Sequence, residues 1–158
     1  MSLFLEDLRV GETTILGTYR FEREAIIAFA RLYDPQPFHL DEDAARRSIY
    51  GSLTASGWHN CSAFMRCFID WIERQRQESA ARGEDLPPVG VAAGVSDLRW
   101  PAPIRPGDVV TYSTKILAKR AIHRPGWGIV TRRSSGVNQD GTEVLDFTSM
   151  IMTGRRTP

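Results

Sequence analysis

Asp34 and His39 lie five residues apart in a segment that also contains Pro35 and Pro37. A carboxylate and an imidazole can hold one water molecule between them and divide the roles of general acid and general base. Adding water to a conjugated double bond needs both roles, and two prolines would limit the movement of the groups that fill them. The same spacing also fits a plainer interpretation, in which Asp34 ends a helix and His39 is a packed or surface side chain.

A second candidate is the sequence Ser56-Gly57, which precedes an apolar helical pattern. Backbone amides at the start of a helix have no acceptor within it, and the helix dipole makes that end positive. A thioester carbonyl bound there would have its developing enolate charge stabilised. Alternatively, Ser56 only caps the helix and Gly57 only allows close packing, and both interpretations can hold at once.

The elements that must position these residues follow from residue periodicity. Apolar spacing and helix-stop signals predict helices over Glu22–Tyr33, Asp41–Arg47 and Ser56–Ala81, with a stiff, extended or turned segment at Asp34–Pro37. Strand composition predicts strands over Thr13–Phe21, Val91–Trp100, Val109–Ile122, Trp127–Val137 and Val144–Thr153. Helices set apart from a run of strands indicate an α+β fold with an antiparallel sheet. The chain, residues 1–158, is expected to be a single domain.

The helix predicted after Ser56 carries the strongest pattern in the chain. Its apolar residues recur every three or four positions and predict one buried face, formed by Trp58, Cys61, Phe64, Met65, Phe68, Ile69 and Ile72. The sheet is therefore expected to wrap around this helix, with Phe64 and Phe68 hidden from solvent. The far end of the helix, Glu73–Arg82, is polar and is expected to be solvated.

Composition excludes several classes of protein. A net charge of +1 gives no electrostatic case for binding nucleic acid, and no apolar run approaches the length of a membrane helix. The first residues do not form a signal peptide, so a cytoplasmic location is expected. Cys61 and Cys67 lie on different faces of one predicted helix and are expected to be reduced. The three histidines show no metal-ligand spacing, so no metal site is predicted.

Three motifs in order give the chain a family resemblance. Asp34-x-x-Pro37-x-His39 resembles the Asp-x-Asn-Pro-Ile/Leu-His signature of MaoC-like dehydratases and (R)-specific enoyl-CoA hydratases. The stretch from Tyr50-Gly51 to Ser56-Gly57 resembles that family's Phe-Gly to His-Gly approach to its central helix, and Leu98–Asp108 resembles its strand and Pro-Gly-Asp connector.

The resemblance implies a hot-dog fold, a homodimer or higher homo-oligomer, and a hydratase or dehydratase of enoyl- or 3-hydroxyacyl-thioesters. It implies that Asp34 and His39 hold the water and that the Gly57 amide binds the thioester carbonyl. The thioester would be carried by CoA or by an acyl-carrier protein, and no metal or other cofactor would be needed. Gln36 and Ser56 stand where the family usually has Asn and often has His, so they are candidate substrate-binding residues at which specificity could differ.

Two other functions remain open. An acyl-CoA thioesterase of the same fold would often carry an acid on the central helix, but here the first acid on that helix is Asp70. A non-catalytic subunit that binds acyl thioesters would explain the departures at Gln36 and Ser56.

Several further residues have plainer interpretations. The aromatic residues of the long helix are expected to be core rather than an acyl tunnel. His59 is expected to be a core or interface residue. A group of basic residues on the predicted strands could meet CoA phosphates, but such residues are more often solvated: Lys119, Arg120, Arg124, Arg132 and Arg133.

Overall fold

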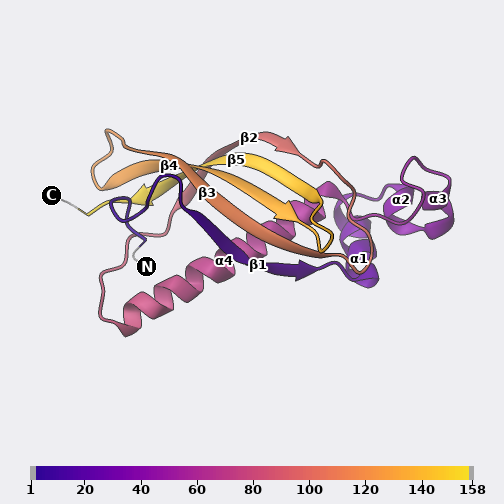
Figure 1. The fold of residues 1–158 in the computed structure, drawn as a ribbon, viewed down its shortest axis with the longest axis horizontal. Coiled ribbons are helices and arrows are strands. Elements are labelled where there is room, and N and C mark those ends of the chain that lie inside the picture. Colours follow the sequence, from indigo (N-terminus) through magenta and orange to yellow (C-terminus); the bar gives the residue numbers. More distant parts are fainter. Residues whose placement is uncertain (1–2, 157–158) are drawn as a thin grey trace.

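A computed structural model of the chain describes residues 3–156. Its helices are α1 (Arg23–Tyr33), α2 (Pro37–Leu40), α3 (Glu42–Arg46) and α4 (Gly57–Ala81). Its strands are β1 (Thr13–Arg20), β2 (Val91–Arg99), β3 (Val109–Ala121), β4 (Trp127–Val137) and β5 (Glu143–Gly154). Each predicted helix and strand is present, with bounds that differ by no more than one residue at either end. In Figure 1, helices α1, α2 and α3 gather at one end of the sheet.

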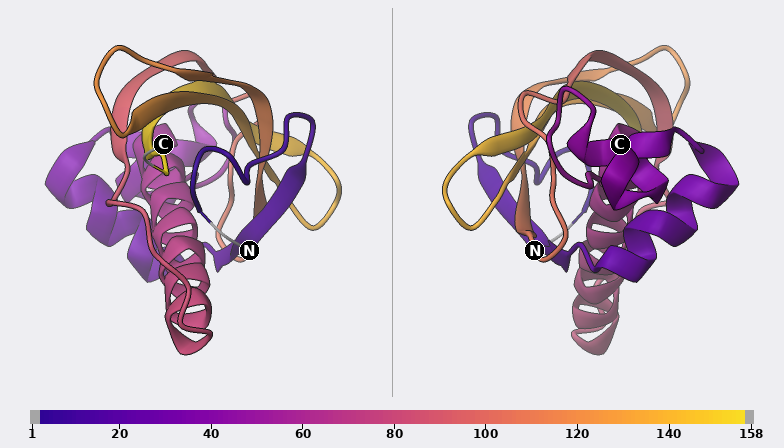
Figure 2. Two further views of the ribbon diagram at one scale, coloured as in Figure 1. Left: turned by 90° about the vertical axis from the view of Figure 1, so that its left-hand side faces the viewer. Right: turned by 90° about the vertical axis from the view of Figure 1, so that its right-hand side faces the viewer.

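The five strands form one antiparallel sheet in the order β1-β3-β4-β5-β2. The sheet arches over α4, as the two end-on views in Figure 2 show. Alternate residues of β3 and β4 face inward, and Val110 and Tyr112 of β3 are completely buried in the cluster that contains the α4 side chains. The predicted α+β architecture, an antiparallel sheet wrapped around a long helix, is therefore confirmed, and this is the hot-dog fold.

The face that α4 turns to the sheet is not the one its apolar residues predict. Phe64 and Phe68 are buried as expected, but Trp58, Met65 and Ile69 are exposed, by 56%, 49% and 37%. The buried face instead follows these residues: His59, Asn60, Ala63, Phe64, Cys67, Phe68 and Trp71. The prediction that the sheet buries Trp58, Met65 and Ile69 was wrong, and in the single chain these side chains leave an apolar strip of α4 uncovered.

Hydrogen bonding explains why a polar residue lies on the buried face. Asn60 donates from Nδ2 to the carbonyl of Val144 at 2.9 Å and accepts from the hydroxyl of Tyr112 at 2.6 Å. Because the polar side chain is satisfied by these partners, its burial carries little penalty. The spacing of apolar residues alone therefore cannot predict a buried helix face that contains a hydrogen-bonded polar side chain.

The segment between α1 and α3 also differs from its prediction. Pro37 is the first residue of the short helix α2. Proline is tolerated at this position because the first amide of a helix has no hydrogen-bond acceptor within the helix. Only the residues before Pro37 are therefore extended. His39 therefore lies on a helical turn that the sequence did not predict. Asp41 caps α3 by accepting a hydrogen bond from the amide of Ala44 at 2.8 Å.

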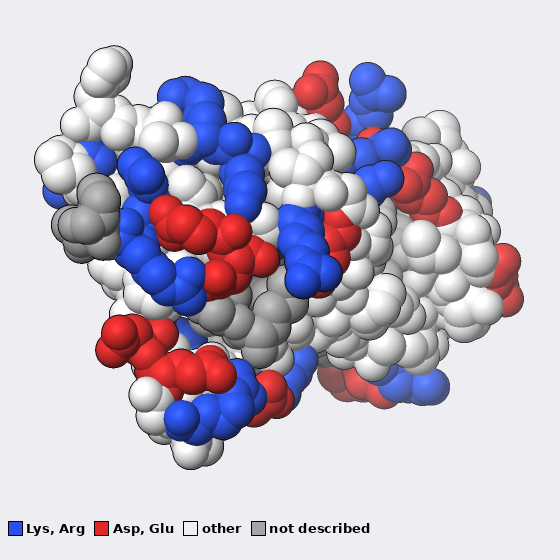
Figure 3. Space-filling model, turned by 60° about the vertical axis from the view of Figure 1, so that its left-hand side comes forward, with Lys and Arg blue, Asp and Glu red and all other residues white. Residues whose placement is uncertain are grey.

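On the face in Figure 3, basic and acidic side chains alternate rather than gathering by sign. Cys61 and Cys67 are free thiols. Within residues 3–156, none of the helices has the length and hydropathy needed to cross a membrane.

Candidate active site

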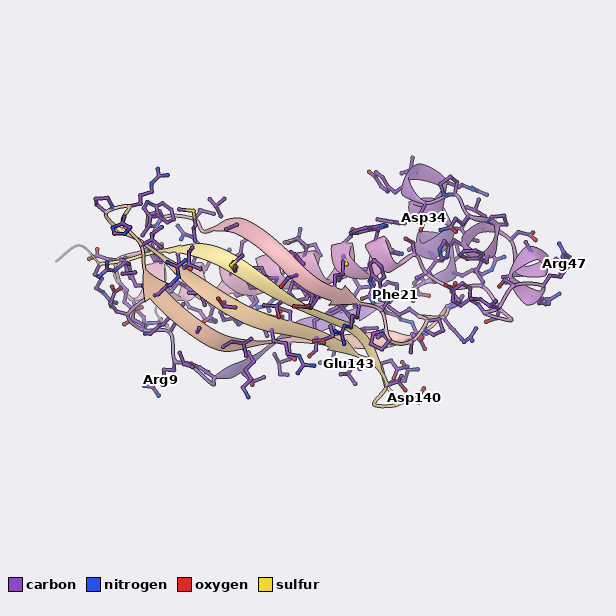
Figure 4. All side chains as sticks on the ribbon, turned by 90° about the horizontal axis from the view of Figure 1, so that it is seen from above. Arg9, Phe21, Asp34, Arg47, Asp140 and Glu143 are labelled. Carbon is purple, nitrogen blue, oxygen red and sulfur yellow. The ribbon has the colours of Figure 1, made fainter. Side chains whose placement is uncertain are left out.

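Asp34 and His39 meet at the end of the sheet that carries helices α1, α2 and α3. Figure 4 shows Asp34 at this end, with Arg47 further out at the tip. The amide of Asp34 donates to the carbonyl of Ala30 at the end of α1. Asp34 therefore does end a helix, as the plainer interpretation predicted. Its carboxylate Oδ2 nevertheless lies 3.4 Å from Nε2 of His39. The structure therefore brings the predicted pair together.

The orientation of the His39 ring is fixed from its other nitrogen. Nδ1 lies 2.7 Å from the backbone carbonyl of Thr54, which can only accept a hydrogen bond. Nδ1 must therefore carry the hydrogen, and Nε2 is left facing Asp34. The His39 side chain is buried, with 7% of its surface exposed, so the ring has little freedom to turn.

Two neighbours hold the Asp34 carboxylate. Gln36 donates from Nε2 to Oδ1 at 2.8 Å, and the Ser56 hydroxyl also forms a hydrogen bond to the carboxylate. Burial alone would raise the pKa of Asp34, but these two bonds, with the nearby His39, outweigh burial and lower the pKa below its ordinary value. Asp34 is therefore ionised at neutral pH, and its carboxylate can accept a hydrogen bond from water.

The start of α4 forms the opposite side of the site. Ser56 caps the helix by accepting a hydrogen bond from the amide of Trp58 at 3.2 Å, and Gly57 is the first helical residue. The amides of the first turn point out of the helix toward the site, where the helix dipole is positive. The indole of Trp100 lies directly against Gly57 and leaves no room for a side chain there.

One cavity of about 410 Å³ joins these groups. All five residues named from the sequence line it: Asp34, Gln36, His39, Ser56 and Gly57. The cavity also has polar and aromatic walls that were not predicted to belong to a site, and these include Tyr50, Thr54, Asn60 and Trp100. Tyr50 and Trp100 belong to the two family-like motifs that lie before and after the long helix in the sequence. Their place in these motifs could have identified them as site residues.

Other titratable groups near the site serve the fold. His59 is buried against Phe21 and stacks on Phe29 with ring centroids 4.7 Å apart, which agrees with its expected core position. Burial lowers the pKa of His59 to about 4. Residues 3–156 contain no group of three or more His, Cys, Asp or Glu side chains placed to hold a metal ion.

The hot-dog fold, with a carboxylate and an imidazole facing the start of its central helix, defines the class of this protein. A family described as "MaoC like domain" matches residues 9–138. The chain therefore belongs to the MaoC-like family.

Individual relatives agree with this assignment. The chain is 30% identical over 115 residues to a 3-hydroxybutyryl-CoA dehydratase of Methylorubrum extorquens, covering 72% of this chain and 64% of that relative. The crystal structure of a MaoC-like dehydratase from Rhodospirillum rubrum matches with a TM-score of 0.82 and 41% identity, over 99% of this chain and 100% of that one.

A more distant structure shares the fold. The unliganded R-hydratase of Pseudomonas aeruginosa has a TM-score of 0.70 at 23% identity, over 99% of this chain and 89% of that one.

Proposed function

We propose that this protein is a hydratase or dehydratase that adds water to enoyl thioesters and removes it from 3-hydroxyacyl thioesters. The observation that carries the proposal is the 3.4 Å separation of Asp34 Oδ2 and His39 Nε2 inside a cavity that also contains the start of α4. One water molecule can contact both atoms at once. Membership of the MaoC-like family and the similarity to a 3-hydroxybutyryl-CoA dehydratase support the same reaction.

In the hydration direction, the water oxygen bonds to the β-carbon while one member of the pair accepts a proton from the water. The other member gives a proton to the α-carbon, so the elements of one water molecule are added. Negative charge that develops on the thioester oxygen is stabilised by the amide of Gly57 and the positive end of α4. Only protons and electron pairs move, so the proposed reaction requires no metal or redox cofactor. CoA or an acyl-carrier protein would carry the acyl group.

The two rival functions have weaker support. Asp70, the first acid on α4, forms an ion pair with Arg66 on the exposed surface and does not line the cavity, so it cannot serve a thioesterase there. Gln36 and Ser56, which suggested a non-catalytic subunit, both donate to Asp34. Although Gln36 and Ser56 differ from the residues that the family usually has, they still provide hydrogen bonds to the carboxylate that the proposed reaction uses.

Turnover of crotonyl-CoA separates the three functions. A hydratase removes the absorbance of the conjugated enoyl thioester without releasing free thiol, a thioesterase releases thiol, and a binding subunit does neither. Product analysis should give 3-hydroxybutyryl-CoA. Release of thiol, or no change in absorbance with protein that binds the thioester, would overturn the proposal.

We also propose that the protein is a homodimer formed through α4 and β2. Trp58, Met65 and Ile69 on α4, with Val91 and Val95 on the edge strand β2, form an exposed apolar surface. Monomers rarely expose large contiguous apolar patches, and a two-fold pair would bury the same surface on both copies.

A further inference from the structure

A second cavity, of about 250 Å³, lies further along α4 than the active site. The active-site cavity is lined by the start of α4 and by Trp100, which follows β2. The second cavity is lined by α4 from Phe64 to Ile72 and by Ala92 and Val95 near the start of β2. The first cavity lies at the start of α4 and the second lies at its middle, so the two follow one another along this helix, although they share no lining residue.

The floor of the second cavity contains a buried cation. Arg132 lies on β4 with only 7% of its surface exposed, and it lines the cavity together with Ser134 and Ser149. Its Nε is buried without a hydrogen-bond partner, and no ion pair to its guanidinium is found among residues 3–156. The expectation that this arginine is solvated was wrong, because the alternation of β4 turns it toward α4.

Glu12 is the neighbouring acid that acts on Arg132, and its Oε2 is also buried without a hydrogen-bond partner, but no ion pair between the two side chains is found among residues 3–156. Burial lowers the pKa of Arg132 to about 10, while Glu12 acts in the opposite direction, so the arginine side chain is still charged at neutral pH. The cavity's other arginine, Arg76, donates to the carbonyl of Pro87 at 2.8 Å. The adjacent Arg133 faces outward and pairs with Asp146 at 2.7 Å. A buried donor without a partner is costly, so an acceptor on a ligand would complete the hydrogen bonding of this guanidinium.

The walls of the cavity define the rest of that ligand. Phe64, Phe68, Trp71 and Phe147 surround the space with apolar surface, whereas the hydroxyls of Ser134 and Ser149 lie at the floor with Arg132. A matching ligand has an apolar body and an anionic end that accepts hydrogen bonds. A carboxylate suits a guanidinium best, because the two can form paired, charge-assisted bonds.

We propose that the acyl group of the substrate ends in a carboxylate, and that Arg132 binds that carboxylate while the thioester lies at Gly57. This inference rests on the proposed function. The acyl chain must then run along α4 from the first cavity to the second. Asn60 of the first cavity and Phe68 of the second are eight residues apart on α4, or about 12 Å along its axis. That span matches an acyl chain of medium length, whereas the crotonyl group needs only the first cavity.

Two substrates of equal length test the proposal. Decenoyl-CoA and decenedioyl-CoA, each with the double bond conjugated to the thioester, differ only in the terminal carboxylate. We expect kcat/KM for decenedioyl-CoA to exceed that for decenoyl-CoA by at least about tenfold, the size of one charge-assisted interaction. Arg132→Met, which keeps an unbranched side chain without charge, should remove this preference, and Arg132→Lys should retain part of it. Arg133→Met is the matched control and should keep the full preference.

A binding measurement separates this inference from the proposed function. Saturated decanedioyl-CoA and decanoyl-CoA cannot be hydrated, and calorimetric titration of both gives their affinities whether or not the protein is a hydratase. Tighter binding of decanedioyl-CoA that is lost in Arg132→Met supports the inference even if crotonyl-CoA is not turned over. Equal binding of the two ligands, or a preference that survives Arg132→Met in a folded variant, would overturn it. So would a loss of dimer mass in Arg132→Met, because Arg132 would then pair with a second copy of the chain.

Discussion

Trp100 lies so close to Gly57 that a Cβ atom at position 57 would be 2.5 Å from Cε2 of the indole. Gly57 is therefore required by the packing of Trp100, which follows β2, against the start of α4, as well as by the access of substrate to the helix start. We expect Gly57→Ala to lower the free energy of unfolding by about 1–3 kcal/mol, the usual cost of overpacking, and to reduce hydration by displacing the indole from the cavity.

A double-mutant cycle with Trp100→Ala tests this contact through thermal or denaturant unfolding. In the Trp100→Ala background the indole is absent, so Gly57→Ala should be nearly neutral. An equal loss of stability in both backgrounds would show that the strain arises elsewhere.

Substitution of Asp34 and His39 tests their roles in chemistry. Asp34→Asn keeps the shape of the side chain but removes the basic carboxylate, and His39→Ala removes the second proton carrier. Each should reduce hydration of crotonyl-CoA by at least about 100-fold. Thioester binding should persist, because the start of α4 is unchanged, and the double variant should be little worse than either single one.

Stability must be measured alongside these rates, since His39 also bonds to the carbonyl of Thr54. A well-folded Asp34→Asn protein that hydrates crotonyl-CoA at nearly the wild-type rate would refute the catalytic assignment. Asp34 would then be only the residue that ends α1.

His59 makes stability depend on pH. Burial lowers its pKa from 6.5 to about 4, so between these values the unfolded chain binds a proton that the folded chain does not. The free energy of unfolding should therefore fall as the pH falls from 6.5 to 4, by at most about 3 kcal/mol from this residue.

Comparison with His59→Phe isolates this contribution, because other groups titrate equally in both proteins. The difference in unfolding free energy between them should change across pH 4–6.5 and be constant above it. A difference that is independent of pH would mean that His59 can be protonated in the folded state, despite its contacts with Tyr19, Phe21 and Phe29.

The proposed dimer surface can be tested at one exposed residue. Val95 on β2 is 58% exposed, so Val95→Lys should leave the monomer fold intact but place a charge in the interface. Light scattering should show a dimer for the wild type and a monomer for the variant. Ile15→Lys is the control, because Ile15 is 61% exposed on β1, the opposite edge of the sheet. A wild-type monomer, or dissociation by Ile15→Lys alone, would contradict the proposed surface.

The sequence was most informative where function limits residue type and spacing together. The motifs around Asp34 and Gly57 predicted groups that are far apart in the chain yet line one cavity. The order of helices and strands was also predictable, because each element carries its own periodicity and stop signals.

The sequence was least informative where a polar side chain is buried. Asn60 turns the buried face of α4 away from Trp58, and this depends on hydrogen bonds to β3 and β5 that local pattern does not contain. Arg132 was expected to be solvated for the same reason, since nothing near it in sequence distinguishes it from Arg133. Which of two adjacent arginines faces the helix is decided by the register of the whole sheet.

The 3.4 Å separation of Asp34 Oδ2 and His39 Nε2 also has a stereochemical consequence. Two atoms so close together approach a planar double bond from the same side. A thioester carbonyl bound at Gly57 would prevent the enoyl group from presenting its other face to them. Under the proposed function, hydrogen and hydroxyl are therefore added to one face of the alkene, which is syn addition. Hydration of crotonyl-CoA in deuterated water should then give a single diastereomer of the deuterated alcohol.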